Sequence, residues 1–339
     1  MANHPPSIVK VITQVNAEQA LAVKEPTQLR GPWAGTIAVL LAGSLFATSG
    51  VLIKHLVQGY GLPPLTVVAA RHTLAALALL GLLGVRDRQL LRIRAHDIPF
   101  FLLFGLICGA LLQASWAYAV SLIDIGVAVV LNYTAPAWAA LFAWPLLGER
   151  INRQKGIALL LTIAGVALIV RIFDTQFLSL NVVGLLWGLA SGVLYGLYGI
   201  FIRRALKRYS LWTTLAYAFA AGALFLVAAQ LVLSPVEASS SRMVSAFTQP
   251  GAALWLVILA LVPTLGGHTL FAFGLRFLEA TVATILATIE PVMATLWAAL
   301  FLGESLTWPQ LIGGGLVIAG VIALQTRRIP LQTTFNTTR

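Results

Sequence analysis

Apolar stretches of about 20 residues recur along almost the whole chain, separated by short polar or glycine-containing breaks. A helix needs ~20 apolar residues to cross the ~30 Å hydrocarbon core of a bilayer. Backbone groups in lipid must be bonded internally, and the ~10-residue alternating segments of a barrel are absent from this sequence. The stretches lie at 33–53, 65–85, 99–120, 125–147, 156–172, 182–202, 211–233, 252–275, 280–302 and 308–326. We therefore predict an all-α integral membrane protein with ten transmembrane helices.

The composition excludes a water-soluble fold and argues against several kinds of site. Hydrophobic residues make up 59% of the chain and charged residues 10%, whereas soluble domains carry about 25% charged residues. A single cysteine, Cys108, rules out a disulfide framework or a cysteine-rich metal site. The sequence shows neither a Walker-type loop nor a nucleophile–base set. We expect no catalytic residue, metal, cofactor or nucleic-acid partner. The expected partners are the lipid bilayer and a small-molecule substrate, with the chain functional as a monomer.

The distribution of basic residues predicts the orientation of the chain. If the N-terminus is cytoplasmic and the chain crosses ten times, 18 of the 22 lysines and arginines fall in cytoplasmic loops or tails. Such an excess is typical of cytoplasmic loops, although phosphate binding is an alternative role for them. We expect a cell-membrane (inner or plasma membrane) protein with both termini cytoplasmic. Residues 1–32 are expected to be a polar, disordered tail without a signal peptide, and residues 327–339 a second cytoplasmic tail.

The second half of the chain repeats the first. An offset of 155 residues aligns Pro136 with Pro291 and Glu149 with Glu304. Nearer the start of each half, an offset of 149 aligns the following: Gly35, Gly43, Phe46, Gly50 and Lys54 with Gly184, Gly192, Tyr195, Gly199 and Arg203. We infer two five-helix repeats, 33–172 and 182–326. Because five is odd, the second repeat enters the membrane from the opposite side. Inverted repeats of this kind are typical of secondary transporters with a site near the bilayer midplane.

These motifs resemble the EamA-type family of the drug/metabolite transporter superfamily. Pro136 and Pro291 are each followed by Leu-Gly-Glu, and Ala-Gly-Val follows in the fifth and tenth spans. Arg71 is similar to the basic residue that the family usually carries in span two. The resemblance covers residues 33–326. It implies an exporter or exchanger of small polar metabolites, often amino acids, or of amphipathic toxins, working by alternating access. An intramembrane enzyme, and a channel or scaffold, are the alternative functions.

Arg71 and Glu290 are the charged residues that lie clearly inside predicted spans. A charge at the bilayer centre costs ~2.5–3.5 kcal/mol on insertion scales, so each should face protein or a wet cavity. Glu290 either lines the central cavity, where it pairs with a cationic substrate group or exchanges a proton, or satisfies backbone groups freed by Pro291. Arg71 either snorkels to the headgroups or points inward to receive a substrate carboxylate. His268, which aligns with Gln113, either relays protons or packs through a hydrogen bond.

Pro136 and Pro291 are predicted to kink their helices at equivalent depths. Interrupted helices at matching positions indicate the binding site of an inverted-repeat carrier, unless the kinks serve packing alone. Asn132 and Tyr133 immediately precede the first kink and are further cavity candidates. Aromatic residues at similar depth either wall a cavity or pack the bundle: Trp116, Tyr118, Trp187, Tyr195 and Tyr198. Four glycines spaced by four residues predict close helix packing in span six: Gly184, Gly188, Gly192 and Gly196.

Overall fold

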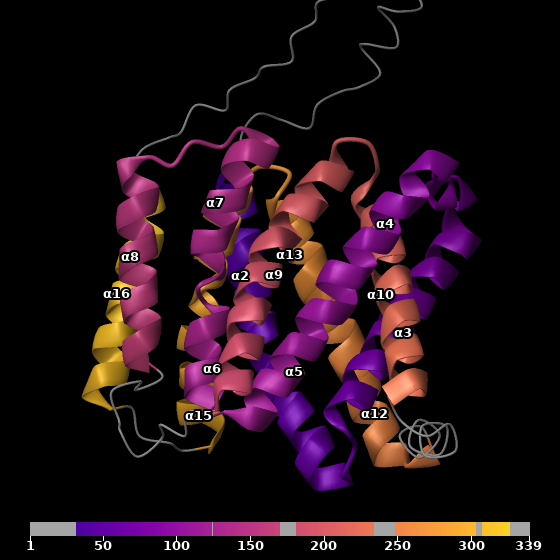
Figure 1. The fold of residues 1–339 in the computed structure, drawn as a ribbon, viewed down its shortest axis with the longest axis horizontal. Helices are drawn as coiled ribbons and strands as arrows, with labels where there is room; N and C mark the ends of the chain where they lie inside the picture. The colour runs from indigo at the N-terminus through magenta and orange to yellow at the C-terminus, as the bar shows by residue number, and fades with distance from the viewer. Residues whose placement is uncertain (1–31, 124, 170–180, 234–247, 303–306, 326–339) are drawn as a thin grey trace, which may run out of the picture.

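The computed structural model describes residues 32–123, 125–169, 181–233, 248–302 and 307–325 (Figure 1). These residues form helices and their connections, without a strand among them. Seven helical segments are long and apolar enough to span a membrane, and Ala280–Ala294 and Trp308–Ala323 form shorter apolar helices. Large apolar side chains such as Leu160 and Leu186 are more than 60% exposed on the outside of the bundle, as expected where lipid covers it. The predicted all-α membrane fold is confirmed.

The described helices form ten rods, of which six are single helices. These are α2 (Pro32–Lys54), α3 (Pro64–Arg86), α8 (Arg153–Ile169), α9 (Val182–Leu206), α10 (Leu211–Leu233) and α16 (Trp308–Gln325). A π-helical turn, η1 (His55–Gly59), extends α2, and the 3₁₀ turns η2 (Arg88–Leu91) and η3 (Ala95–Asp97) follow α3. Pro64 begins α3, where its missing N–H costs nothing.

Four rods are interrupted, and the interruptions are equivalent in the two halves. The third rod is α4 (Ile98–Phe104), η4 (Gly105–Leu111) and α5 (Leu112–Leu122), and the eighth is α12 (Pro250–Leu259), η6 (Ala260–Gly266) and α13 (Gly267–Gly274). The fourth is α6 (Ile125–Asn132) and α7 (Ala135–Leu147), and the ninth is α14 (Ala280–Ala287) and α15 (Ile289–Leu302). The π-helical segments η4 and η6 differ by the same 155 residues that align the repeats, and so do the ends of α6 and α14.

The packing of the rods follows the same symmetry. In one half of the molecule α2 packs on α13, α14 and α15, and in the other α9 packs on α5, α6 and α7. On one side of the molecule α3 packs on α10, while α8 and α16 pair at the opposite edge (Figure 1). Exchanging the two repeats maps this pattern onto itself. The first helix of each repeat therefore packs against the third and fourth rods of the other repeat.

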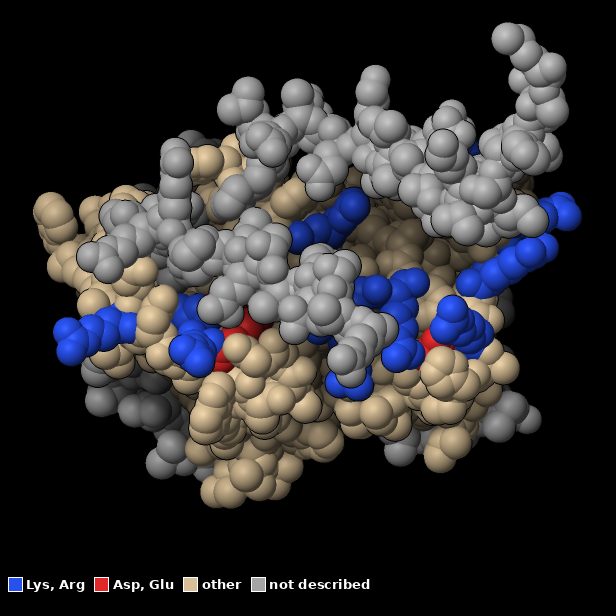
Figure 2. Space-filling view, turned by 90° about the horizontal axis from the view of Figure 1, so that it is seen from above, with Lys and Arg blue, Asp and Glu red and all other residues tan. Residues whose placement is uncertain are grey.

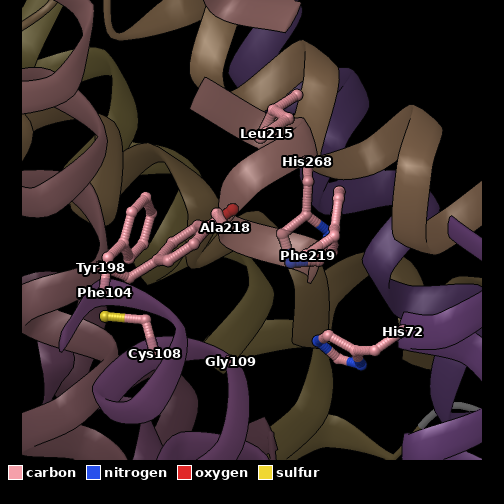
Figure 3. Close-up of a pocket in the computed structure, with 9 residues that line it drawn as sticks. All are labelled: His72, Phe104, Cys108, Gly109, Tyr198, Leu215, Ala218, Phe219 and His268. Atoms are coloured by element: carbon pink, nitrogen blue, oxygen red, sulfur yellow. The ribbon is translucent and has the colours of Figure 1, made fainter. Parts of the chain in front are cut away.

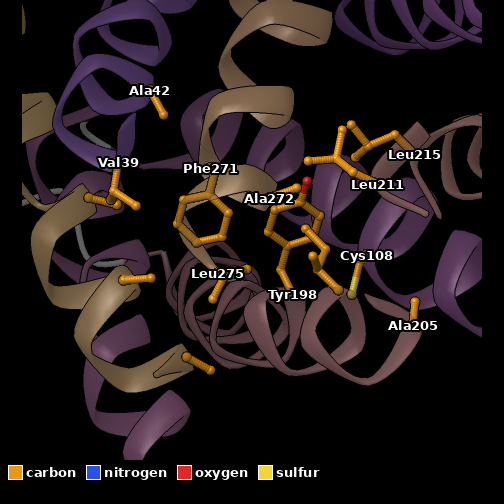
Figure 4. Packing of buried hydrophobic residues seen from close by; sticks show 14 of the residues in the cluster. Val39, Ala42, Cys108, Tyr198, Ala205, Leu211, Leu215, Phe271, Ala272 and Leu275 are labelled. Atoms are coloured by element: carbon orange, nitrogen blue, oxygen red, sulfur yellow. The ribbon is translucent and has the colours of Figure 1, made fainter. Parts of the chain in front are cut away.

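We name the two groups after these contacts. The first bundle consists of α2, α12, η6, α13, α14 and α15, and the second bundle of α4, η4, α5, α6, α7 and α9. One apolar cluster crosses both, because it includes Val39 and Phe271 of the first bundle, Cys108 and Tyr198 of the second, and Leu215 of α10 (Figure 4).

Glycines allow the closest helix contacts in both halves. A Cβ on Gly192 would collide with the carbonyl oxygen of Leu131, and one on Gly43, its aligned counterpart, would collide with Ile289. A Cβ on Gly184 or Gly188 would likewise collide with α5–α6 residues, and one on Gly196 would lie 2.7 Å from Trp138 Cβ. The structure thus places the whole predicted glycine stripe against the second bundle's interrupted fourth rod and the end of its third.

Basic residues gather at one end of the molecule, which we call the basic end. The connections α3–α4, α7–α8, α9–α10 and α13–α14 lie there, at the top of Figure 1. Figure 2 shows that end, with many Lys and Arg side chains and few Asp and Glu. Which membrane face it adopts stays a prediction. The tail up to residue 31, residues 327–339 and Glu304 lie outside the described residues.

Candidate functional site

A small cavity of about 20 Å³ lies among α3, α4, η4, α9, α10 and α13 (Figure 3). A cavity of this volume holds about one water molecule. The residues that line it are His72, Phe104, Cys108, Gly109, Tyr198, Leu215, Ala218, Phe219 and His268. Gly109 belongs to η4, and His268 follows η6 by two residues. The π-helical segment η4 therefore lines the cavity and η6 ends two residues before one of its lining residues; such segments are frequent at functional sites.

Two histidines contribute the ring nitrogens of the cavity. Nδ1 of His72 lies 3.0 Å from the carbonyl oxygen of Val68, and Nδ1 of His268 lies 2.6 Å from that of Thr264. A carbonyl oxygen can only accept a hydrogen bond, so each Nδ1 carries a proton. Phe219 stands between the rings, with its centroid 5.7 Å from that of His72 and 5.3 Å from that of His268.

Arg71 points into the protein beside this cavity. Its Nη1 donates to Ser49 Oγ on α2 at 3.1 Å, and its Nη2 donates to Gln113 Oε1 on α5. Arg71 is only 6% exposed, so the alternative that its side chain snorkels to the headgroups is wrong. Gln113, the counterpart of His268 in the repeat alignment, is an acceptor for this guanidinium.

Glu290 lies where the interrupted helices of the two repeats meet. It is the second residue of α15, immediately after the break at Thr288. Its carboxylate accepts a hydrogen bond from the hydroxyl of Tyr133, which lies in the equivalent break between α6 and α7. Tyr195 of α9 is close enough to feel the charge of Glu290. About ten residues, or ~15 Å, separate Glu290 from the start of α14 at the basic end, which places it near mid-depth.

Four other predicted site residues do not line the cavity: Trp116, Tyr118, Trp187 and Asn132. Tyr118 and Trp187 stack on each other with ring centroids 5.4 Å apart. Trp116 packs nearby against the cluster around Ala119. These three rings lie at the contact of α5 with α9, outside the set that lines the described cavity. Asn132 is the last residue of α6 and is half-buried.

Pro136 and Pro291 follow the two breaks directly. Pro136 is the second residue of α7, and Pro291 the third residue of α15. Since proline cannot donate a backbone hydrogen bond, each stands where the preceding helix ends and a new one begins.

A cluster of charged residues at the basic end joins the two repeats. Glu149 is 5% exposed and accepts hydrogen bonds from the backbone N–H groups of Ala280 (2.7 Å) and Thr281 (3.2 Å). It thereby caps the N-terminus of α14, where a negative charge is favoured. Arg203 pairs with Glu149 at 2.5 Å, and Lys155, 2% exposed, pairs with Glu279. We call Glu149, Lys155, Arg203 and Glu279 the ionic cluster.

The sequence signalled only part of this cluster. The repeated Leu-Gly-Glu motif singled out Glu149, but its hydrogen-bond partners are 54 or more residues away in the chain. The position aligned with Lys155 in the second repeat is Gln310, which accepts from the N–H and hydroxyl of Thr307, both at 2.9 Å. The cluster at the basic end therefore has no identical copy in the second repeat.

The helices, the equivalent breaks and the buried polar groups define a multi-pass membrane transporter built from two matching halves. The chain belongs to the EamA-like transporter family, whose model matches it twice, at residues 33–171 and 182–326. Among the described residues, no group of three or more His, Cys, Asp or Glu side chains could hold a metal ion.

Several relatives match over nearly their whole length. An uncharacterized transporter of Archaeoglobus fulgidus is 28% identical over 85% of this chain and 95% of its own. A probable terminal-alkyne amino-acid exporter of Streptantibioticus cattleyicolor is 30% identical over 88% and 94%, and a pseudopaline exporter of Pseudomonas aeruginosa 27% over 86% and 95%. A solved structure described only as "Crystal structure of protein" has a TM-score of 0.69 at 20% identity, covering 87% of this chain and 99% of that one. This likeness shows the shared fold alone.

Proposed function

We propose that this protein is a secondary transporter that exports or exchanges small polar or amphipathic metabolites, amino-acid-like compounds among them. The observation that carries the proposal is the hydrogen bond between Tyr133 and Glu290, which joins the equivalent helix breaks of the two repeats near mid-depth. Breaks at matching positions of inverted repeats are where such carriers bind substrate. The names of two relatives, both exporters, support the same class of activity.

Alternating access follows from the arrangement of the bundles. Glu149, at the end of α7 in the second bundle, caps α14 of the first bundle. Rocking the bundles apart at the basic end must break this cap, and doing so at the opposite end leaves it in place. The ionic cluster is then the closed gate of the basic end, which we place in the cytoplasm together with both chain termini.

Glu290 is the proposed contact for a positively charged substrate group. Its partner is the neutral hydroxyl of Tyr133, so a cationic group of the substrate adds a charge-assisted bond that the protein itself lacks there. We place the remaining cavity candidates around this point: Asn132, Tyr195, Tyr198, His268 and Arg71. We propose that one chain is sufficient for transport, since both repeats that form the site belong to it.

Transport by purified protein in vesicles tests the proposal. Metabolites that accumulate differently in cells with and without this gene supply the candidate cargo. A carrier loaded with that cargo shows saturable counterflow of the labelled compound. Flux that does not saturate supports a channel instead, and conversion of the compound supports an enzyme; either result overturns the proposal.

A further inference from the structure

Arg71 is a buried cation that lacks an acidic partner among the residues that the structure describes. Its two bonds go to an uncharged hydroxyl and an uncharged amide, those of Ser49 and Gln113. Its Nε, also buried, has no hydrogen-bond partner in the described part of the chain. Buried charges are normally paired, because leaving water without compensation is costly. The site therefore has unused capacity to bind an anion.

The surroundings of Arg71 add no competing negative charge. Its neighbour His72 and, across the cavity, His268 are both near enough to feel its charge. In both rings Nδ1 donates to a carbonyl oxygen, and a histidine side chain supplies no negative charge. Glu290, the other charged residue within the spans, is bonded to Tyr133 and not to Arg71.

The guanidinium also bridges the two bundles. Ser49 belongs to α2 of the first bundle, and Gln113 to α5 of the second. Arg71 itself lies two turns from the start of α3, at the end opposite the ionic cluster. The bundles are thus joined through Glu149 at the basic end and through Arg71 toward the other end.

We infer that Arg71 is the receptor for a carboxylate group of the transported substrate, and that this carboxylate displaces Ser49 and Gln113 as it binds. The inference rests on the proposed transport function and narrows its substrate class to carboxylate-bearing compounds. A carboxylate accepts two parallel bonds from a guanidinium, and charge-assisted bonds are stronger than those to a hydroxyl or an amide. Because the displaced acceptors belong to different bundles, binding releases the bridge and couples substrate to opening at that end.

Matched pairs of small probes test the chemical class directly. The full chain in lipid nanodiscs is heated with L-leucine or L-phenylalanine, and with isoamylamine or phenethylamine, which lack only the carboxylate. We expect the two acids to raise the melting temperature and the two amines to leave it unchanged. The inference is overturned if the amines stabilise the protein as much as the acids do, or if neither acid stabilises it.

Variants separate binding from a purely structural bridge. Arg71→Gln should abolish the response to the acids. Ser49→Ala keeps the cation but removes a competing acceptor, so the apparent Kd for the acids should fall roughly two- to tenfold. A structural role predicts no tighter binding, and an unchanged or weaker affinity in Ser49→Ala overturns the inference even if Arg71→Gln does not fold.

The same variant in the counterflow assay separates this inference from the proposed function. Unimpaired saturable counterflow with Arg71→Gln overturns the carboxylate receptor and leaves the transporter intact. Absence of saturable counterflow with the unaltered chain overturns the function itself.

Discussion

At the scale of single residues, the hydrogen bond between Tyr133 and Glu290 is the feature that the transport proposal most depends on. We expect Glu290→Gln to lower counterflow about tenfold or more while expression stays intact. A charged hydrogen bond contributes ~1.5–3 kcal/mol, and the amide cannot supply that interaction to a cationic substrate group. Counterflow of labelled cargo in vesicles measures the effect.

Tyr133→Phe is the matched control for that variant. It removes the same hydrogen bond but keeps the carboxyl group, so transport should fall less than with Glu290→Gln. Normal counterflow of Glu290→Gln at every pH would rule out a direct role for the carboxyl group.

Sequence alone identified Arg71 and Glu290 as charged residues inside the spans, but not their partners. Arg71 and Glu290 stood out because a charge inside an apolar span is energetically costly unless it faces protein or a wet cavity. The direction of Arg71 and the bond from Tyr133 depend on how distant helices pack, which no local pattern encodes. The aromatic residues Trp116, Tyr118 and Trp187 were selected by depth alone. A helix that is apolar all round gives no signal of which face turns inward.

At the scale of elements, the contact between α9 and the break in the fourth rod limits what can replace Gly192. Gly192→Ala should destabilise the protein by about 1–3 kcal/mol, because its Cβ meets the backbone of Leu131 and the hydroxyl of Thr134. Thermal unfolding in a fixed detergent measures this change.

Gly199→Ala, on the same helix, is the control. A Cβ there would lie 3.6 Å from Ala280 Cβ and Thr284 Oγ1, an ordinary contact, and alanine favours the helix. Equal losses of stability in the two variants would contradict the described packing of α9.

The loops of the basic end are tied by Tyr209, whose hydroxyl donates to Asp97 Oδ2 at 2.6 Å and accepts from Arg94 N at 3.1 Å. Burial of the ring, with the bond to Asp97, raises the pKa of Tyr209 above its ordinary value of 10. A raised folded pKa gives a stability contribution that is complete below the unfolded pKa and is lost as pH rises through the folded value.

Tyr209→Phe should therefore lower the melting temperature by the same amount at pH 7.5 and pH 9.0. The difference should shrink only above about pH 10. A difference that vanishes between pH 7.5 and pH 9.0 would contradict the described bond.

The positions of the helices could be predicted from the sequence, but their internal geometry could not. Hydropathy and length located the rods, because the bilayer imposes both. The π-helical segments η4 and η6 gave no recognisable pattern, since one extra residue per turn is invisible among apolar residues. Their equivalence emerges only when the observed bounds are compared across the repeats.

At the scale of the whole molecule, each of the two bundles combines helices from both repeats. The bundles meet around Arg71, Tyr133 and Glu290. The duplication was visible in the sequence because proline and glycine recur at fixed offsets. The sequence did not show that α2 packs against helices of the other repeat, because packing partners are set by the three-dimensional arrangement. The charge pattern anticipated one orientation, and the structure gathers the basic connections of the described chain at one end (Figure 2).

The ionic cluster offers a way to shift the bundles without knowing the cargo. Glu149→Gln removes the charge that caps α14 and pairs with Arg203. We expect it to favour the conformation that is open at the basic end and, because the proposed mechanism moves the bundles as units, closed at the other.

Distances between spin labels in nanodiscs test this claim most directly, in a background where Cys108 is replaced by alanine. One pair, at Ile151 and Arg276, reports on the basic end, and a second, at Val182 and Gln249, on the opposite end; all four residues are exposed. The account predicts that Glu149→Gln lengthens the first distance and shortens the second. A change at the basic end alone, or two distances that lengthen together, would contradict alternating access.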